Sequence, residues 1–173
     1  MSAPEKDVSG AVDTAAGRWD GLRIVGQREF PGIAQSAGAA RRWALELLEG
    51  HASAERLETL ELLISEVVTN AVLHSDSARP GGLVTVRVGV GDDLIHIEVI
   101  DDGSATSVPA IRTTDDDSLS GRGLSWVDRL ACAWGTDRDD EAGGAVWFRL
   151  GHSPSDQDTP PFPHGEGGLG FPR

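Results

Sequence analysis

The sequence predicts an α+β fold, a two-layer sandwich in which helices cover one face of a mostly antiparallel sheet. Three observations predict it. Residues 83–90 and 94–101 alternate apolar and polar side chains around a Gly-Asp-Asp turn, which predicts an antiparallel hairpin. Two segments with helical periodicity precede the hairpin. A third such segment and one more strand follow it.

The first elements are a strand and two helices. The segment LRIVGQREF, residues 22–30, alternates as a strand does and ends at Pro31-Gly32. Apolar residues then recur at helical spacing through residues 40–48. Ser53 is the expected N-cap of a second helix, which should be largely buried. Its apolar stripe consists of Leu57, Leu60, Ile64, Val67 and Ala71.

The elements after the hairpin are a long loop, a helix and a strand. The polar stretch from Gly103 to Ser120 is long for a compact domain and predicts a lid or binding loop. Residues 123–132 have helical spacing, and residues 145–150 alternate as a strand with Val146, Phe148 and Leu150 inward. We expect the acidic run at 137–141 to be solvated loop. Three further residues are expected in the core, namely Trp126, Trp134 and Cys132.

The chain divides into one folded domain and two tails. Residues 1–20 are small and polar without periodicity, which predicts a flexible N-terminal tail. Residues 152–173 are rich in Pro and Gly and predict a second flexible tail. The folded domain is therefore expected at residues 21–151, a suitable length for one hydrophobic core.

Composition excludes several classes of function. The formal net charge of −13 disfavours a general binder of nucleic acid or of anionic membranes. One cysteine excludes an internal disulfide, so a reducing cytoplasm is the expected location. The N-terminus lacks the features of a signal peptide, and the sequence has no apolar run long enough for a transmembrane helix.

Three polar motifs carry the candidate chemistry. Glu66, Asn70 and His74 are spaced i, i+4, i+8 on the second helix, which aligns their side chains. Asp101 ends the inward apolar row of its strand, where a carboxylate suits a flat heterocycle with an exocyclic amine. The segment Gly121-Arg122-Gly123 opens a helix, where backbone N–H groups can approach an anion.

Each motif alone has an ordinary structural explanation. The first could be the solvent-facing edge of a helix, the second a strand-end turn, and the third a simple helix start. His74 is treated as a capping or packing residue.

The three motifs in this order resemble the histidine-kinase-like ATPase fold of the GHKL superfamily. The resemblance rests on SEVVTNAVLH, VIDDG, GRGLSWVDRLA and GGAVWF, and it spans about residues 22–150. Within that superfamily the sequence is most similar to the bacterial anti-sigma-factor serine/threonine kinase branch. These are free-standing regulatory ATP-binding proteins of partner-switching systems.

The resemblance implies a role for each motif. Glu66 is then the general base and Asn70 the Mg²⁺ ligand. Asp101 is the residue that reads adenine, and Gly103 belongs to the same motif. Three positions would lie on the phosphate side of ATP after the lid, namely Gly121, Arg122 and Gly123. Arg41 occupies the first-helix arginine position near the phosphates.

The resemblance implies an ATP-dependent protein serine/threonine kinase. It would control transcription by holding or releasing a sigma factor or an anti-sigma antagonist, and a homodimer is one assembly compatible with this function. The alternative is a non-catalytic, ATP-gated binding module that sequesters such a regulator. The acidic, lysine-free lid with Asp115, Asp116 and Asp117 favours this alternative. A sensor histidine kinase is disfavoured, because no helical dimerisation segment precedes residue 21.

Overall fold

The computed structural model describes residues 17–103, 123–139 and 143–151. The predicted C-terminal tail and most of the predicted N-terminal tail lie outside these residues. So do Gly121, Arg122 and, apart from Gly103, the segment predicted to be a lid or binding loop, which contains the three consecutive aspartates. Within the described ranges, no helix is both long enough and apolar enough to cross a membrane.

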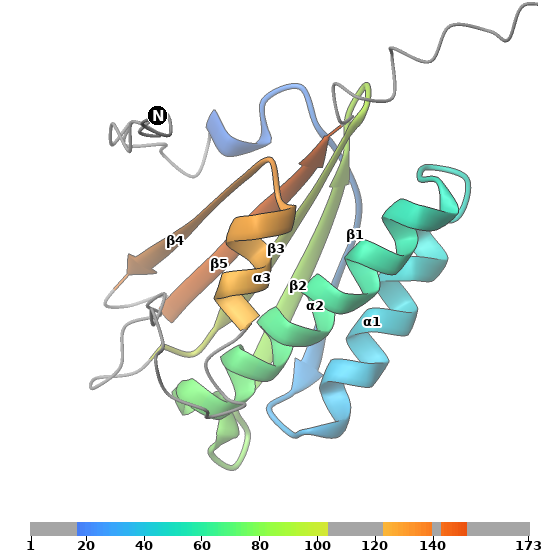
Figure 1. Ribbon diagram of the computed structural model, residues 1–173. Coiled ribbons are helices and arrows are strands. Elements are labelled where there is room, and N and C mark those ends of the chain that lie inside the picture. The colour runs from blue at the N-terminus through green and yellow to red at the C-terminus, as the bar shows by residue number, and fades with distance from the viewer. Residues whose placement is uncertain (1–16, 104–122, 140–142, 152–173) are drawn as a thin grey trace, which may run out of the picture.

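A five-stranded sheet forms one layer of the domain (Figure 1). The strands are β1 (Arg23–Pro31), β2 (Leu83–Val90), β3 (Leu94–Asp101), β4 (Ala133–Asp139) and β5 (Gly143–Gly151). Their order is β1-β2-β3-β5-β4, and every neighbouring pair is antiparallel. The predicted hairpin is therefore confirmed as β2 and β3 in the middle of the sheet.

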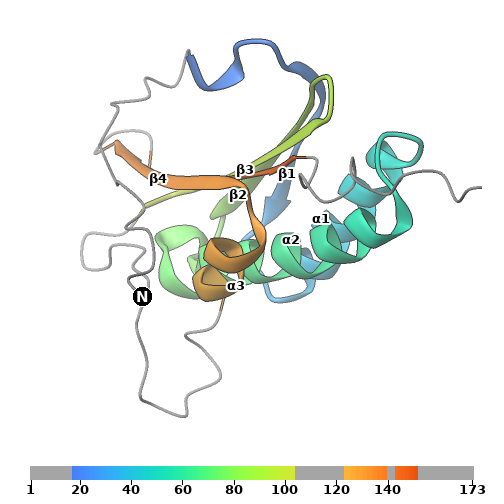
Figure 2. The same cartoon turned by 45° about the horizontal axis from the view of Figure 1, so that its top comes forward.

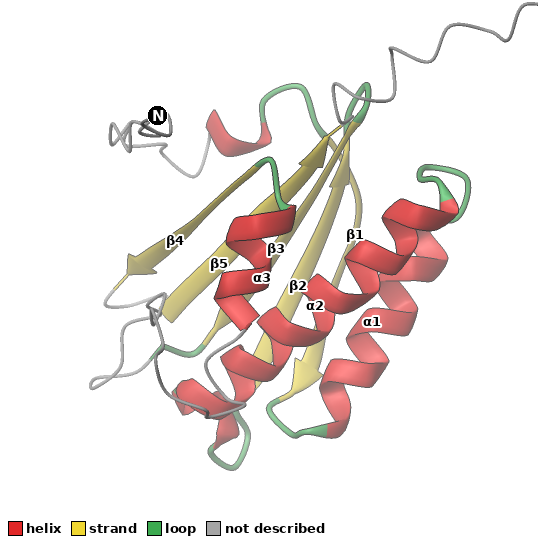
Figure 3. Ribbon diagram, viewed as in Figure 1, coloured by secondary structure: helices red, strands yellow, loops and turns green. Residues whose placement is uncertain are grey.

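Three helices form the second layer. They are α1 (Gln35–Leu48), α2 (Ala54–His74) and α3 (Gly123–Leu130). Figure 2 shows all three on the same face of the sheet, and Figure 3 separates the helical layer from the strands by colour. Ser53 caps α2 as predicted, because its side chain accepts a hydrogen bond from the Arg56 N–H at 3.4 Å. The predicted α+β sandwich is confirmed.

The core lies between the sheet and α2. Apolar residues alternate toward the helices along the three central strands. Those on the strands are Val84, Val86, Val88, Ile95, Ile97, Val99, Val146, Phe148 and Leu150. Those on α2 are Leu60, Leu63, Ile64, Val67, Val68, Ala71 and Val72. Each fully buried aliphatic side chain contributes about 1.5–3 kcal/mol relative to its exposed state, so this interface fixes the position of α2 on the sheet.

The opposite face of the sheet is partly covered by a short 3-10 turn, η1 (Gly17–Trp19). Arg18 is 1% exposed and donates a 2.7 Å hydrogen bond to the Glu98 carboxylate of β3. It also pairs with Asp137 of β4, and its carbonyl oxygen accepts from Arg149 of β5 at 2.6 Å. The turn thereby contacts three strands. The predicted boundary at residue 21 is too late, because this turn is packed on the domain.

Other predictions about individual residues are wrong. The acidic run at 137–141 is expected to be loop, but its first three residues belong to β4. An edge strand with charged side chains lacks a clear apolar alternation. Trp126 is 38% exposed, since α3 turns Leu124 and Val127 inward instead. Cys132 is exposed rather than part of the core. Leu73 is 60% exposed, so α2 is less completely covered than expected.

Candidate functional site

Glu66 and Asn70 lie in the C-terminal half of α2, which is unbroken through both positions. Both side chains are half-buried, and the neighbouring Val67 and Ala71 are buried. Their spacing places them one turn apart on the same side of the helix. They therefore line the border between the buried stripe and solvent, where an amide or carboxylate can reach a ligand. His74 is the last residue of the helix and is exposed.

Asp101 ends β3 on the helix-facing side of the sheet, where it is 8% exposed. Its Oδ1 accepts the backbone N–H of Gly103 at 2.6 Å and that of Gly144 at 3.3 Å. Within the described part of the chain, the hydrogen bonds to this carboxylate both end on Oδ1. Oδ2 is consequently the oxygen that can accept a hydrogen bond from a ligand.

The environment of Asp101 disfavours its charge. Burial raises the pKa of this carboxyl above its ordinary value, while the two N–H donors act in the opposite direction. The two backbone hydrogen bonds therefore do not fully compensate for the cost of burying the ionised carboxyl group. A buried acceptor of this kind is typical of sites that recognise a polar ligand group.

A tight glycine pair holds Asp101 in place from β5. Gly144 lies directly opposite Asp101 in the antiparallel register. Gly143 has φ of +93°, and a Cβ at this position would overlap the carbonyl oxygen of Asp101. Only glycine therefore fits here. In the sequence this pair is only part of the GGAVWF motif, and its contact with Asp101 becomes visible in the strand register.

Of the glycine-motif residues, the structure describes Gly103 and Gly123. Gly103 directly follows Asp101-Asp102, and its carbonyl oxygen accepts the Asp76 N–H at 2.6 Å. Gly123 is the first residue of α3, which packs beside α2 in both views (Figures 1 and 2). Gly121 and Arg122 lie outside the described residues.

Arg41 projects from α1 toward α2. Its guanidinium donates to Ser65 Oγ at 3.3 Å and lies 3.7 Å from a Glu61 oxygen. These contacts place it beside the stretch of α2 that contains Glu66. Because the side chain is about one-third exposed, the ion pair contributes little to stability and leaves the arginine accessible.

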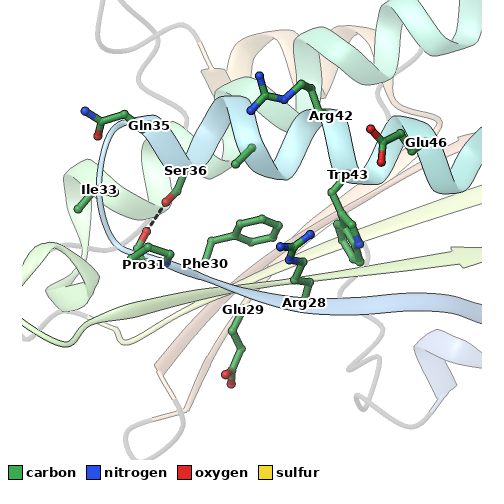
Figure 4. A pocket seen from close by; sticks show the side chains of 11 residues that line it. Arg28, Glu29, Phe30, Pro31, Ile33, Gln35, Ser36, Arg42, Trp43 and Glu46 are labelled. Atoms are coloured by element: carbon green, nitrogen blue, oxygen red, sulfur yellow. Dashed lines mark hydrogen bonds between the residues drawn. The ribbon is translucent and has the colours of Figure 1, made fainter.

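A cavity of about 460 Å³ lies elsewhere, between edge strand β1 and α1 (Figure 4). The rings of Phe30 and Trp43 meet edge to face in its wall, with centroids 5.8 Å apart. Arg28, Arg42 and other charged side chains surround them. The predicted site residues that the structure describes do not line this cavity, so it is separate from the site around Asp101.

Comparison with known families and proteins identifies similar sequences. Residues 30–150 match the family described as histidine kinase-like ATPase domain. This match includes α1, α2, the whole hairpin, α3 and nearly all of β5.

Curated relatives match over shorter regions. The anti-sigma F factor of Geobacillus stearothermophilus is 35% identical over 49 residues, which cover 28% of this chain and 34% of that protein. The serine-protein kinase RsbW of Oceanobacillus iheyensis is 27% identical over 93 residues, covering 53% and 54%. The serine-protein kinase RsbW of Bacillus subtilis is 29% identical over 86 residues, covering 49% of each. The chain thus spans between a third and about half of the length of these relatives.

Proposed function

The chain belongs to the histidine kinase-like ATPase domain family, and on this premise we propose that it is an ATP-dependent regulatory protein kinase of the anti-sigma type. It would transfer the γ-phosphate of ATP to a serine or threonine hydroxyl of a protein partner. The partner would be a sigma factor or the antagonist of an anti-sigma factor, and the outcome would be control of transcription. The names of the matched relatives support this choice within the family.

The observation that carries the proposal is the buried Asp101 carboxylate. Oδ1 is occupied by two backbone N–H groups, and Oδ2 remains for a ligand. We propose that Oδ2 accepts a hydrogen bond from the exocyclic amine of adenine. Guanine presents a carbonyl oxygen at the corresponding position, so two acceptors would face each other and GTP would bind more weakly.

Asn70 and Glu66 of α2 are the residues proposed to act at the phosphates of ATP. Asn70 is half-buried, and its amide oxygen suits Mg²⁺, which prefers oxygen ligands and retains several waters beside phosphate oxygens. When bound, the ion would supply positive charge to the phosphates. Glu66, one turn earlier, would accept the proton of the partner hydroxyl.

Four further residues complete the proposed site. Gly121 and Gly123 would bring backbone N–H groups to the phosphates at the start of α3. Arg122 would add a bidentate phosphate contact. Arg41 lies beside α2 and would act near the same phosphates.

Separate substitutions of Glu66 and Asn70 test the division of roles. Glu66→Gln should leave ATP affinity nearly unchanged and lower phosphoryl transfer by about 10²–10⁴-fold, the usual effect of losing a positioned base. Asn70→Ala should lower both, because the metal links the protein to the phosphates. Glu58→Gln is the matched control, since it removes an exposed carboxylate from the same helix. The measurements are Mg²⁺-dependent ATP binding and transfer of labelled phosphate to candidate partner proteins.

The outcomes separate the kinase from its main alternative. Equal losses of ATP affinity in Glu66→Gln and Asn70→Ala would show that Glu66 is not a base. Adenine-selective binding without detectable transfer would favour a non-catalytic, ATP-gated module that sequesters its partner. The lysine-free composition of the segment between Gly103 and Gly123 is the observation in favour of that module.

A further inference from the structure

A short 3-10 turn, η2 (Asp76–Ala78), follows the C-terminal end of α2 and contains the fully buried Ser77. Ser75 joins this turn to the helix. Its hydroxyl donates to the Ala71 carbonyl oxygen at 2.5 Å and accepts the Ser77 N–H at 3.1 Å. These two hydrogen bonds fix the turn to the C-terminal end of α2.

Ser77 connects the C-terminal end of α2 to the start of β2 and to the residue that follows β3. Its hydroxyl donates to the Leu83 carbonyl oxygen at 2.7 Å and accepts the Asp102 N–H at 2.9 Å. Asp102 in turn accepts the Leu83 N–H through Oδ2 at 2.9 Å. The start of β2 and the end of β3 are thus both attached to one serine hydroxyl.

A second contact strengthens the attachment. The Asp76 N–H donates to the Gly103 carbonyl oxygen at 2.6 Å. The backbone of Gly82 also lies so close to Ser77 that a Cβ there would overlap the Ser77 carbonyl oxygen. Ser77 is therefore fixed on several sides. The Asp101–Gly103 segment makes two hydrogen bonds with η2, one donated by the Asp76 N–H and one accepted by the Ser77 hydroxyl.

We propose that Ser77 is a positioning residue of the nucleotide site, which sets the Asp101 carboxylate relative to the helix that carries Glu66 and Asn70. This inference rests on the proposed function. The adenine contact at Asp101 and the metal contact at Asn70 belong to one ligand, so the distance between β3 and α2 has to match that ligand. Hydrogen bonds link Ala71 to Ser75, Ser75 to Ser77, and Ser77 to Asp102. Because each link is a direct hydrogen bond, α2 and the end of β3 are held at a fixed separation.

Loss of the Ser77 hydroxyl should affect base recognition in particular. Without it the Asp102 N–H loses its acceptor, and the segment next to Asp101 can shift relative to α2. The carboxylate itself keeps its hydrogen bonds from Gly103 and Gly144. What changes is therefore the position of the carboxylate relative to α2. The contact most sensitive to placement is the directional hydrogen bond to adenine, and its loss corresponds to about tenfold in affinity.

The test compares ATP and GTP dissociation constants, in the presence of Mg²⁺, for the full chain and for Ser77→Ala. Ser53→Ala is the matched control, because it removes a serine hydroxyl from the other end of α2. We expect Ser77→Ala to weaken ATP about tenfold with little change for GTP. Ser53→Ala should lower the melting temperature and leave the ATP-to-GTP ratio as in the wild type.

A second variant covers the case in which Ser77→Ala does not fold. Asp102 is exposed, so Asp102→Ala should fold and should raise the ratio of the ATP to the GTP dissociation constant, by a smaller factor than Ser77→Ala does. Equal weakening of ATP and GTP, or a wild-type ratio in the folded variants, would overturn the inference alone. A wild-type chain that binds ATP and GTP equally would overturn the proposed function and this inference with it.

Discussion

Lowering the pH from 7 to 5 should destabilise the domain through one buried histidine, His96 of β3. The side chain is fully buried on the helix-free face, between the rings of Trp19 and Trp147. Its Nδ1 accepts a hydrogen bond from Arg149 Nε at 3.2 Å, so this nitrogen carries no proton. Burial first, and then the positive charges of Arg149 and Arg18, lower the pKa of His96 to about 3.

The sign and size of the effect follow from linkage. In the unfolded chain His96 takes up a proton as the pH falls through about 6.5, whereas the folded chain does not until about pH 3. The stability associated with neutral His96 is therefore present above pH 6.5 and is lost as the pH falls toward 3. For one group with these values, the loss between pH 7 and pH 5 is about 2 kcal/mol.

Urea unfolding at pH 7 and pH 5 measures this loss. The wild type and the control His51→Gln, which removes an exposed histidine, should lose about 2 kcal/mol more than His96→Gln. Comparing the change with pH, rather than stability at one pH, removes the cost of replacing a packed side chain. If His96→Gln loses as much stability as the wild type, the folded state protonates His96 near its ordinary pKa and the argument fails.

Two further predictions concern buried charges on the two faces of the sheet. Arg18→Ala should destabilise the fold by about 2–4 kcal/mol, because among the described residues Glu98 then keeps Arg87, about one-third exposed, as its one ion-pair partner. Arg79→Ala breaks an exposed ion pair and should cost less than about 1 kcal/mol in the same denaturant titration. Equal losses would contradict the reasoning. Asp101→Asn should raise the melting temperature at pH 7, because it removes a carboxyl whose raised pKa makes its charged form costly, and this gain should vanish at low pH. The same variant should weaken ATP by about ten- to a hundredfold in calorimetry, since the amide oxygen stays with the two N–H donors and an NH₂ group then faces the adenine amine; unchanged ATP affinity would rule out Asp101 as the adenine contact.

Most of the fold could be predicted because its elements have strong local patterns. The hairpin has strict alternation with a turn signal, and α2 has a cap and a continuous apolar stripe. The elements that were missed depend on distant contacts. β4 is an edge strand that pairs only with β5, and the turn at Gly17–Trp19 is held by side chains far along the chain. No local period marks either segment.

The candidate site residues differ in how far the sequence points to them. Glu66, Asn70 and Asp101 could be named because each stands out from an apolar pattern on its own element. Ser77 could not be, since a serine in a polar turn has no distinguishing pattern, and its importance depends on contacts with Leu83 and Asp102. Residue chemistry thus predicts which groups can contact a ligand, whereas tertiary contacts determine which groups hold them in place.

The buried polar groups differ between the two faces of the sheet, and this difference indicates which of them serves a ligand. On the helix-free face, Arg18 and Glu98 neutralise each other, and His96 stays neutral beside Arg149. The charge on this face is therefore balanced within the protein, although Arg18 Nε and His96 Nε2 are buried without a hydrogen-bond partner among the described residues. On the helix-facing side, Asp101 is held by backbone N–H groups and has no cationic partner among its hydrogen bonds in the described chain. An ionised carboxyl kept in this state lowers stability at neutral pH, so a ligand that donates a hydrogen bond to it would recover part of that cost on binding.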